Sequence, residues 1–227
     1  MQRIIPNLWC NQTADDAAEF YTRTFHDAKV LGSVSYPTEG LLDFQQPYAG
    51  KTLTIDLAIH GLQITLVNGG DEFRPGIACS FQVLIPDEQY LRDLHRELTE
   101  FELMPLQEYD FAPLYSWVAD RYGVNWQLML APDADEVKVR PALMFRAEHQ
   151  NQANRAVETY LGLFEDSEWL SKHMYPEANQ TVTTDSILYS EFKLAGQEFV
   201  AMDSGAPQQE TFTPGIAFLV LPWPGGD

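Results

Sequence analysis

The chain has 227 residues, of which 45% are hydrophobic and 12% aromatic, so it is long and apolar enough to bury a core. Acidic residues outnumber Lys and Arg by 33 to 14, which gives a formal net charge of -19. This balance argues against a nucleic-acid or anionic-membrane partner, because no cationic surplus exists to contact phosphate groups. The acidity otherwise indicates solubility.

The two cysteines, Cys10 and Cys79, each lie in an apolar run and are expected to be buried and unpaired. The N-terminus lacks the pattern of a signal peptide, and no apolar run approaches the roughly 20 residues that span a bilayer. We therefore expect a cytoplasmic protein.

The first predicted unit begins with a strand over residues 3–10 and a helix that starts at Thr13 and runs to Phe25. Thr13 and Asp16 form a capping-box pattern, in which the hydroxyl accepts a first-turn amide. Residues 29–36 are the next predicted strand. Residues 38–50 are a predicted loop whose apolar side chains fold over a cleft.

A hairpin completes this unit over residues 51–68, with the turn at His60-Gly61. One face of the hairpin is apolar and suits the helix. The other face carries Asp56 and Thr65 among its polar side chains.

The second predicted unit has a strand over 77–85 and a helix over 87–102, followed by a loop to Pro113. Its last two strands cover 116–119 and 125–130, and Asp120 and Arg121 form a turn and a surface ion pair between them. Residues 131–136 are a polar linker and the predicted domain boundary.

The first unit then repeats. Pro6 and Gly61 match Pro141 and Gly196 at one interval, and Arg-Pro-Gly-Ile-Ala at 74–78 returns as Thr-Pro-Gly-Ile-Ala at 213–217. The fourth unit starts at Gly215 and is reduced to its first strand before the ending Pro-Trp-Pro-Gly-Gly-Asp. The predicted fold is thus α+β, built from tandem βαβββ units, with a complete module at 1–130 and a truncated second module at 137–227.

These segments resemble the PhnB-like branch of the vicinal oxygen chelate superfamily, which includes glyoxalase I, extradiol dioxygenases and bleomycin-resistance proteins. The residues that carry the resemblance are the first strand and helix, Asn68-Gly69-Gly70, Pro75-Gly76-Ile77-Ala78 and, most specifically, residues 117–127. The resemblance implies the glyoxalase/bleomycin-resistance-like fold, with paired units around a shared cleft. The branch often bears the label 3-demethylubiquinone-9 3-methyltransferase.

Active members of the superfamily hold a divalent metal with His and Glu side chains from four strands. The matching positions here are occupied by weak ligands or by none, so we expect neither a metal nor another cofactor; these positions are Ile5 or Pro6, Thr65, Gly76, Gln127, Arg140 or Pro141, Val200 and Gly215. A glyoxalase- or dioxygenase-type metal enzyme stays as an alternative. The methyltransferase label is disfavoured, because the first strand is not followed by a glycine-rich loop.

The leading hypothesis is a metal-free protein that binds a small organic molecule between aromatic walls. The expected ligand-binding residues are Asn7, Trp9, Thr65, Trp117, Trp126, Gln127 and Glu191. In an alternative hypothesis Asp56, partly desolvated in the cleft, is the general base of an enzyme with an unknown substrate. A third is a scaffold that has lost its site. The unpaired strand at 218–221 predicts a homodimer.

Overall fold

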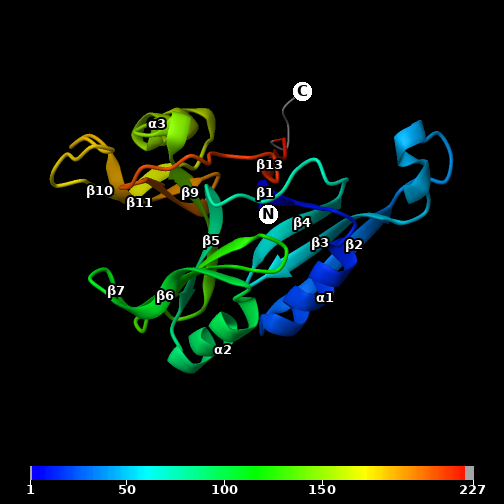
Figure 1. The fold of residues 1–227 in the computed structure, drawn as a ribbon, viewed down its shortest axis with the longest axis horizontal. Coiled ribbons are helices and arrows are strands. Elements are labelled where there is room, and N and C mark those ends of the chain that lie inside the picture. The colour runs from blue at the N-terminus through cyan, green and yellow to red at the C-terminus, as the bar shows by residue number, and fades with distance from the viewer. Residues whose placement is uncertain (1, 223–227) are drawn as a thin grey trace.

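The computed structural model of the chain describes residues 2–222, so the last five residues of the predicted ending lie outside the described part. Three βαβββ units follow one another, as predicted, and a single further strand follows them (Figure 1). The first unit comprises β1 (Ile4–Cys10), α1 (Ala14–Thr24), β2 (Ala28–Ser35), β3 (Thr52–Ile59) and β4 (Leu62–Asn68). The second comprises β5 (Cys79–Ile85), α2 (Glu88–Leu98), β6 (Phe101–Tyr109), β7 (Ala112–Ala119) and β8 (Asn125–Leu130). The third comprises β9 (Lys138–Phe145), α3 (Ala153–Leu163), β10 (Glu168–Met174), β11 (Ile187–Leu194) and β12 (Gln197–Asp203), and β13 (Ile216–Val220) follows.

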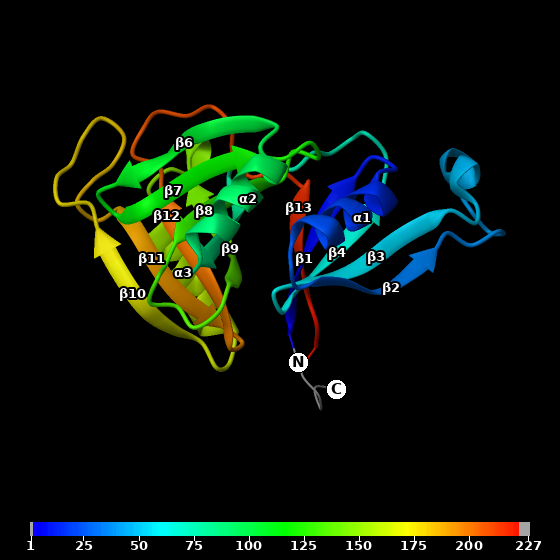
Figure 2. The same ribbon diagram turned by 90° about the horizontal axis from the view of Figure 1, so that it is seen from below.

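The strands form two sheets, which are well separated in Figure 2. One has five strands in the order β13-β1-β4-β3-β2, and the other has eight in the order β10-β11-β12-β9-β5-β8-β7-β6. Units two and three therefore share one sheet through the antiparallel pair β5 and β9, while β13 pairs with β1 of unit one. The predicted modules 1–130 and 137–227 describe repeats in the sequence and do not follow the division into sheets.

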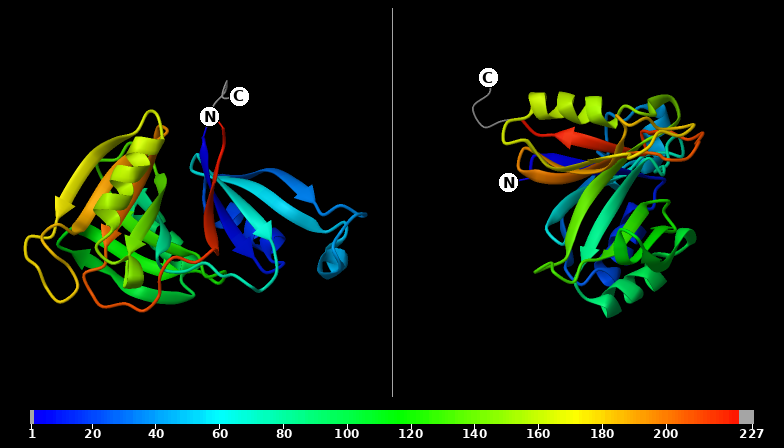
Figure 3. Two further views of the ribbon diagram at one scale, coloured as in Figure 1. Left: turned by 90° about the horizontal axis from the view of Figure 1, so that it is seen from above. Right: turned by 90° about the vertical axis from the view of Figure 1, so that its left-hand side faces the viewer.

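The main core lies where α1 and α2 meet their sheets. The apolar stripe of α1 is buried as its spacing predicts, and Tyr21 and Phe25 are each 1% exposed. Their rings pack against Trp126 of the second unit, so unit one and unit two share this core. The shared core fixes the five-stranded sheet beside the eight-stranded one (Figure 3).

Helix α1 is capped from a distant strand and not by its own sequence. Thr13 makes no side-chain capping bond, so the predicted capping box is wrong. Instead Asn68 Oδ1, at the end of β4, accepts the Ala14 amide at 2.9 Å. In the third unit Asp203 Oδ1 accepts the Ala153 amide at 3.2 Å. The starts of α1 and α3 are thereby each fixed to the last strand of their own unit.

Two predictions about loops are wrong. The predicted loop to Pro113 contains strand β6, and residues 38–50 include a short 3₁₀ helix, Asp43–Tyr48. Leu42 and Phe44 of that segment are 60% and 68% exposed and cover no cleft.

The prediction about the two cysteines is confirmed. Cys10 and Cys79 are buried and unpaired, and burial raises the pKa of each thiol to about 12. Over residues 2–222 the structure has no helix that is both long and apolar enough to cross a membrane.

Candidate functional site

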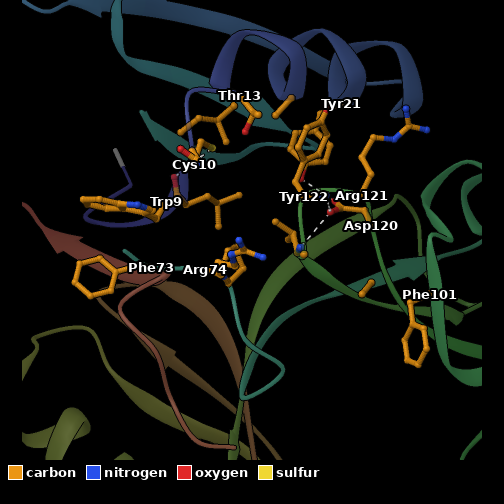
Figure 4. Close-up of a pocket in the computed structure, with 18 residues that line it drawn as sticks. Trp9, Cys10, Thr13, Tyr21, Phe73, Arg74, Phe101, Asp120, Arg121 and Tyr122 are labelled. Carbon is orange, nitrogen blue, oxygen red and sulfur yellow. Dashed lines mark hydrogen bonds between the residues drawn. The ribbon is translucent and has the colours of Figure 1, made fainter. Parts of the chain in front are cut away.

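A cavity of about 480 Å³ lies between unit one and unit two (Figure 4). We call it the Trp9 pocket. Unit one contributes the end of β1 and the start of α1, and unit two contributes the segment before β5 and the turn between β7 and β8. The lining residues include Trp9, Asn11, Thr13, Tyr21, Phe73, Arg74, Phe101, Asp120, Arg121 and Tyr122.

Trp9, one of the predicted ligand-binding residues, lines one wall of the pocket. Its Nε1 donates a hydrogen bond to the Gly70 carbonyl at 2.8 Å, and its ring meets Phe73 edge-on with centroids 5.1 Å apart. The ring lies against Gly69, where an added Cβ would come within 1.9 Å of it. Gly69 therefore makes room for the indole, and the hydrogen bond to Gly70 fixes the orientation of the ring.

Arg74 supplies positive charge to the pocket. Within residues 2–222 no hydrogen bond or ion pair engages its guanidinium, although its backbone carbonyl accepts a bond from Thr213 Oγ1 at 2.7 Å. That bond holds the backbone at Arg74, and Figure 4 shows the Arg74 side chain among the residues that line the pocket. The site thus combines an aromatic wall with a cation that is available to a ligand.

Asp120 forms the floor of the Trp9 pocket and is 3% exposed, so the predicted surface ion pair is wrong. Its carboxylate accepts bonds from the Tyr21 hydroxyl at 2.7 Å and the Trp126 indole at 2.8 Å, and also from two backbone amides. Burial raises the pKa of Asp120, and these four donors oppose that rise. Arg121 instead lies over the Phe20 ring at 4.6 Å.

Asn7, Thr65 and Asp56 lie away from this pocket, on the face of the five-stranded sheet opposite to α1. Thr65 Oγ1 donates to Asp56 Oδ1 at 2.6 Å, and the two residues are paired across β3 and β4. Asn7 is paired with Thr65 across β1 and β4, and its amide bonds to the Ile5 carbonyl. These three predicted residues are brought together, but none of them lines the Trp9 pocket.

Trp117 and Gln127 lie on the eight-stranded sheet, directly opposite each other across β7 and β8. Gln127 accepts a bond from the Tyr115 hydroxyl at 3.0 Å and donates to Ser80 Oγ at 2.9 Å. Trp117 is 7% exposed, and its indole nitrogen has no partner in the described chain. This face of the sheet, away from α2 and α3, is therefore filled mainly by its own side chains.

Glu191 belongs to a charged cluster on the same sheet. The guanidinium of Arg140 donates to Glu191 at 2.5 Å, to Gln82 at 2.9 Å and to Glu198 at 3.4 Å. Burial alone would raise the pKa of Glu191, but the charge and hydrogen bonds of Arg140 lower it overall. The Tyr189 hydroxyl bonds to Glu191, and burial raises the pKa of Tyr189 to about 12.

Trp126 is a core residue and not a pocket wall. Its side chain is fully buried against Phe25 and Phe81, on the face of β8 opposite to that of Gln127. Side chains alternate between the two faces of a strand. Trp117 and Trp126 flank one turn but lie on opposite faces of the sheet, so their environments differ.

The side chains present do not fit a divalent metal ion. Gly76 precedes β5, and the strand residue that pairs with Gln127 is Gln82. Arg140 pairs in turn with Gln82, so a fixed cation already occupies the centre of the sheet face. Between residues 2 and 222, no three His, Cys, Asp or Glu side chains lie close enough to share a metal.

The sequence did not indicate Phe73, Arg74 or Tyr122 as site residues. The sequence does contain one signal for Arg74. The repeated segments 74–78 and 213–217 are identical except at this position, where the first has Arg and the second has Thr. The pocket also depends on two loops from different units, and no local pattern predicts how such loops meet.

Comparison with known proteins gives the fold and the family. Glyoxalase I from Zea mays, in a variant form, is 13% identical with a TM-score of 0.59, over 95% of this chain and 73% of that one. A Bacillus subtilis protein titled as a candidate dioxygenase is 11% identical with a TM-score of 0.51, over 93% and 67% of the two chains. A PhnB protein from Bacillus cereus is 26% identical with a TM-score of 0.48, over 57% of this chain and all of that one.

No curated protein matches the chain. The glyoxalase and dioxygenase likenesses show that the two sheet modules have the glyoxalase/bleomycin-resistance fold, which confirms the predicted α+β class. The sequence profile described as 3-demethylubiquinone-9 3-methyltransferase matches residues 2–129 and 137–222. The chain therefore belongs to the family that this profile describes.

Proposed function

We propose that the protein binds a small organic molecule in the Trp9 pocket and does so without a metal ion. The cavity, about 480 Å³, falls within the range of ligand pockets, roughly 300–1,000 Å³. Trp9 and Phe73 supply a rigid aromatic wall for a planar apolar part of the ligand.

The observation that carries the proposal is the unengaged guanidinium of Arg74 beside this wall. Acidic side chains outnumber basic ones by 33 to 14, yet none of the described ones pairs with Arg74. A guanidinium binds carboxylate and phosphate groups through paired hydrogen bonds. We therefore expect a planar ligand that carries an anionic group.

A thermal-shift screen of aromatic organic acids, followed by calorimetry on the compounds that raise the melting temperature, tests this proposal. Arg74→Gln should weaken binding about tenfold or more, because hydrogen bonds to charged groups contribute about 1.5–3 kcal/mol. Arg155→Gln is the matched control, since Arg155 is exposed on α3 and lies far from the pocket. Equal affinity in both variants, or no binding in the wild type, would reject the proposal.

The alternative function is an enzyme that uses Asp56 as a general base. In its favour, the Thr65 hydroxyl fixes Asp56 Oδ1 at 2.6 Å, which orients the carboxylate on the sheet face. Asp56→Asn should then retain ligand binding and lose turnover of any substrate found. Unchanged turnover would eliminate Asp56 as the base.

Methyl transfer, which the family description suggests, is not the activity that we propose. Support comes from topology, because usual methyl-transfer domains have an α/β sheet with a glycine-rich loop after the first strand. Here β1 leads into α1 through Asn11-Gln12-Thr13, and the five-stranded sheet is mixed.

We also propose that the protein forms a homodimer through β13. This strand lies at the edge of the five-stranded sheet, and its Leu219 and Val220 side chains are 48% and 50% exposed. Exposed strand edges pair readily with other strands, and a lysine at such an edge prevents this. Sedimentation should show a dimer for the wild type and for Val34→Lys at the opposite edge, and a monomer for Leu219→Lys. A wild-type monomer at micromolar concentration would contradict the proposal.

A further inference from the structure

A buried arginine lies at the end of β9, outside the Trp9 pocket. Arg146 is 3% exposed and directly follows Phe145, the last residue of the strand. Its backbone is extended, with a φ of -155° and a ψ of 169°, so its side chain points to the face opposite to that of Phe145. Because Phe145 packs in the core beside α3, the guanidinium of Arg146 lies on the face of the eight-stranded sheet that is away from α3.

The chain gives this guanidinium fewer partners than a buried charge requires. In the described structure its one hydrogen bond runs from Nη2 to Oε1 of Gln208. Nε and Nη1 are both buried, and neither has a partner within residues 2–222. Burial lowers the pKa of Arg146, because it penalises the charged form. A guanidinium nevertheless keeps its proton in a protein, so a positive charge is buried here against one neutral amide.

Acidic side chains do not compensate this charge. Glu210 opposes the change in the pKa of Arg146, yet the two side chains form no ion pair in the part of the chain that the structure describes. Burying a charge is costly unless an opposite charge and hydrogen bonds compensate it. The chain has 33 acidic residues, but the acceptor in contact with Arg146 is the neutral side chain of Gln208.

The repeated unit shows that the fold does not require an arginine here. The amide that follows β4 bonds to the Cys10 carbonyl, and the amide that follows β12 bonds to the Phe145 carbonyl in the same way. Arg146 therefore matches Asn11, which is exposed. A position that holds a small polar residue at the surface of unit one thus holds a buried cation in unit three.

The segment that covers Arg146 is exposed on its outer side. Residues 204–215, which we call the strap, connect β12 with β13, and Figure 2 shows them as the orange-red loop that leaves the eight-stranded sheet. Residues 205–210 of the strap are all exposed, and Gln208 is one of them. Displacement of Gln208 would therefore uncover the guanidinium without opening the core.

We infer that Arg146 anchors a second binding site, which takes a compact anion with a carboxylate or phosphate group in the place that Gln208 Oε1 holds. An oxyanion accepts hydrogen bonds from two nitrogens of one guanidinium and also supplies the opposite charge. Gln208 is then a neutral occupant that the anion displaces. Arg146 does not line the Trp9 pocket, so the site does not depend on the ligand proposed there.

The melting temperature, measured against the concentration of sodium formate and separately of inorganic phosphate, tests the site. Each anion replaces a bulky sulfonate at constant sodium concentration, and the two series distinguish a carboxylate from a phosphate ligand. With at least one anion, the wild type should gain about 3 °C at a tenfold excess over Kd.

Arg146→Met should abolish this gain. Without the anion it should be at least as stable as the wild type, because an apolar side chain of similar volume leaves no uncompensated charge. Arg155→Met is the matched control at an exposed position on α3, and Arg74→Gln removes the cation of the Trp9 pocket; both should keep the gain.

Gln208 gives an independent test. Gln208→Ala should tighten binding of the anion about two- to tenfold, because the anion no longer displaces a hydrogen bond. Gln209→Ala, at the next exposed position of the strap, should stay within about twofold. The inference is overturned if neither anion stabilises the wild type more than Arg146→Met, which would mean that water or Glu210 completes the guanidinium. It is equally overturned if Gln208→Ala weakens binding, or if Arg74→Gln alone loses the gain.

Discussion

Gly69 is required by the side chain of Trp9 and not by its own backbone conformation. Its φ lies outside the left-handed region, but an added Cβ would meet three atoms of the indole ring within 2.5 Å. The ring itself is tied to the Gly70 carbonyl, so it has little freedom to yield. A single methyl group at this position therefore displaces a wall of the Trp9 pocket.

We predict that Gly69→Ala destabilises the protein by about 1–3 kcal/mol, the usual cost of overpacking. It should also change the tryptophan emission and weaken ligand binding in the Trp9 pocket. Gly32→Ala is the control, because a Cβ at Gly32 meets no atom within 4 Å. Urea unfolding followed by fluorescence measures both variants, and equal stability of the two would contradict the steric argument.

The charge of Glu191 gives a prediction about pH. Because Arg140 lowers the pKa of Glu191 in the folded state, the pair stabilises the fold above the unfolded pKa, about 4.3. That stability is lost as the pH falls through the lower, folded pKa. Glu191→Gln should therefore destabilise the protein at neutral pH and flatten the dependence of stability on pH below about 4.3.

Urea unfolding at several pH values checks this prediction. Glu158→Gln is the control, because Glu158 is 58% exposed and forms only a long surface pair, of 3.8 Å, with Lys172. If Glu191→Gln keeps the full acid dependence of the wild type, the pair with Arg140 does not contribute to it.

At the scale of elements, the strict alternation of apolar and polar residues predicts the strands well. The strand that the sequence did not predict lacks this alternation. The hairpin of β3 and β4 alternates throughout and was predicted almost to the residue. Strand β6 was missed because its pairing with β7 has three register shifts and it contains Pro105, so it has no clean alternation. The cap of α1 was wrong because its acceptor, Asn68, lies 54 residues from Ala14.

The distant cap can be tested directly. Asn68→Ala should destabilise the protein by about 1 kcal/mol or more, because it removes both the Ala14 cap and a bond to the Thr52 carbonyl. Asn68→Asp should retain the cap, since Asp203 performs this function in unit three. Thermal unfolding ranks the variants, and Thr13→Ala, predicted to be nearly neutral, shows whether the sequence-based cap has any role.

At the scale of the whole molecule, the sequence predicts the repeated units but not which units pair with each other in a sheet. Periodicity and repeated motifs give the order of the units, because each unit is local in sequence. The pairing of β5 with β9 and of β13 with β1 depends on contacts between distant segments. The same holds for the Trp9 pocket, of which the sequence predicted Trp9 but not Arg74.

Asp120 connects the two sheets, because one carboxylate accepts hydrogen bonds from Tyr21 of α1 and from Trp126 of β8. Replacing it with alanine leaves these two buried side-chain donors, and also two backbone amides of the turn, without their acceptor where unit one meets unit two. The cost is about 1–3 kcal/mol for each buried donor. We predict that Asp120→Ala lets unit one open separately from the eight-stranded sheet. Hydrogen exchange should then become faster in β3 and β4 than in β5 and β8, whereas the wild type opens all four strands together.

Asp87→Ala separates this coupling from a general loss of stability. Asp87 Oδ1 also accepts a hydrogen bond from a partly buried backbone amide, that of Tyr90, at 2.6 Å. This bond lies within the second unit, at the start of α2. Its loss should accelerate exchange around α2 and leave β3 and β4 coupled to the rest of the molecule. If Asp120→Ala accelerates exchange equally in both sheets, the contact at Asp120 contributes stability but does not join the sheets, and the coupling must then reside in the aromatic packing of Phe25 on Trp126.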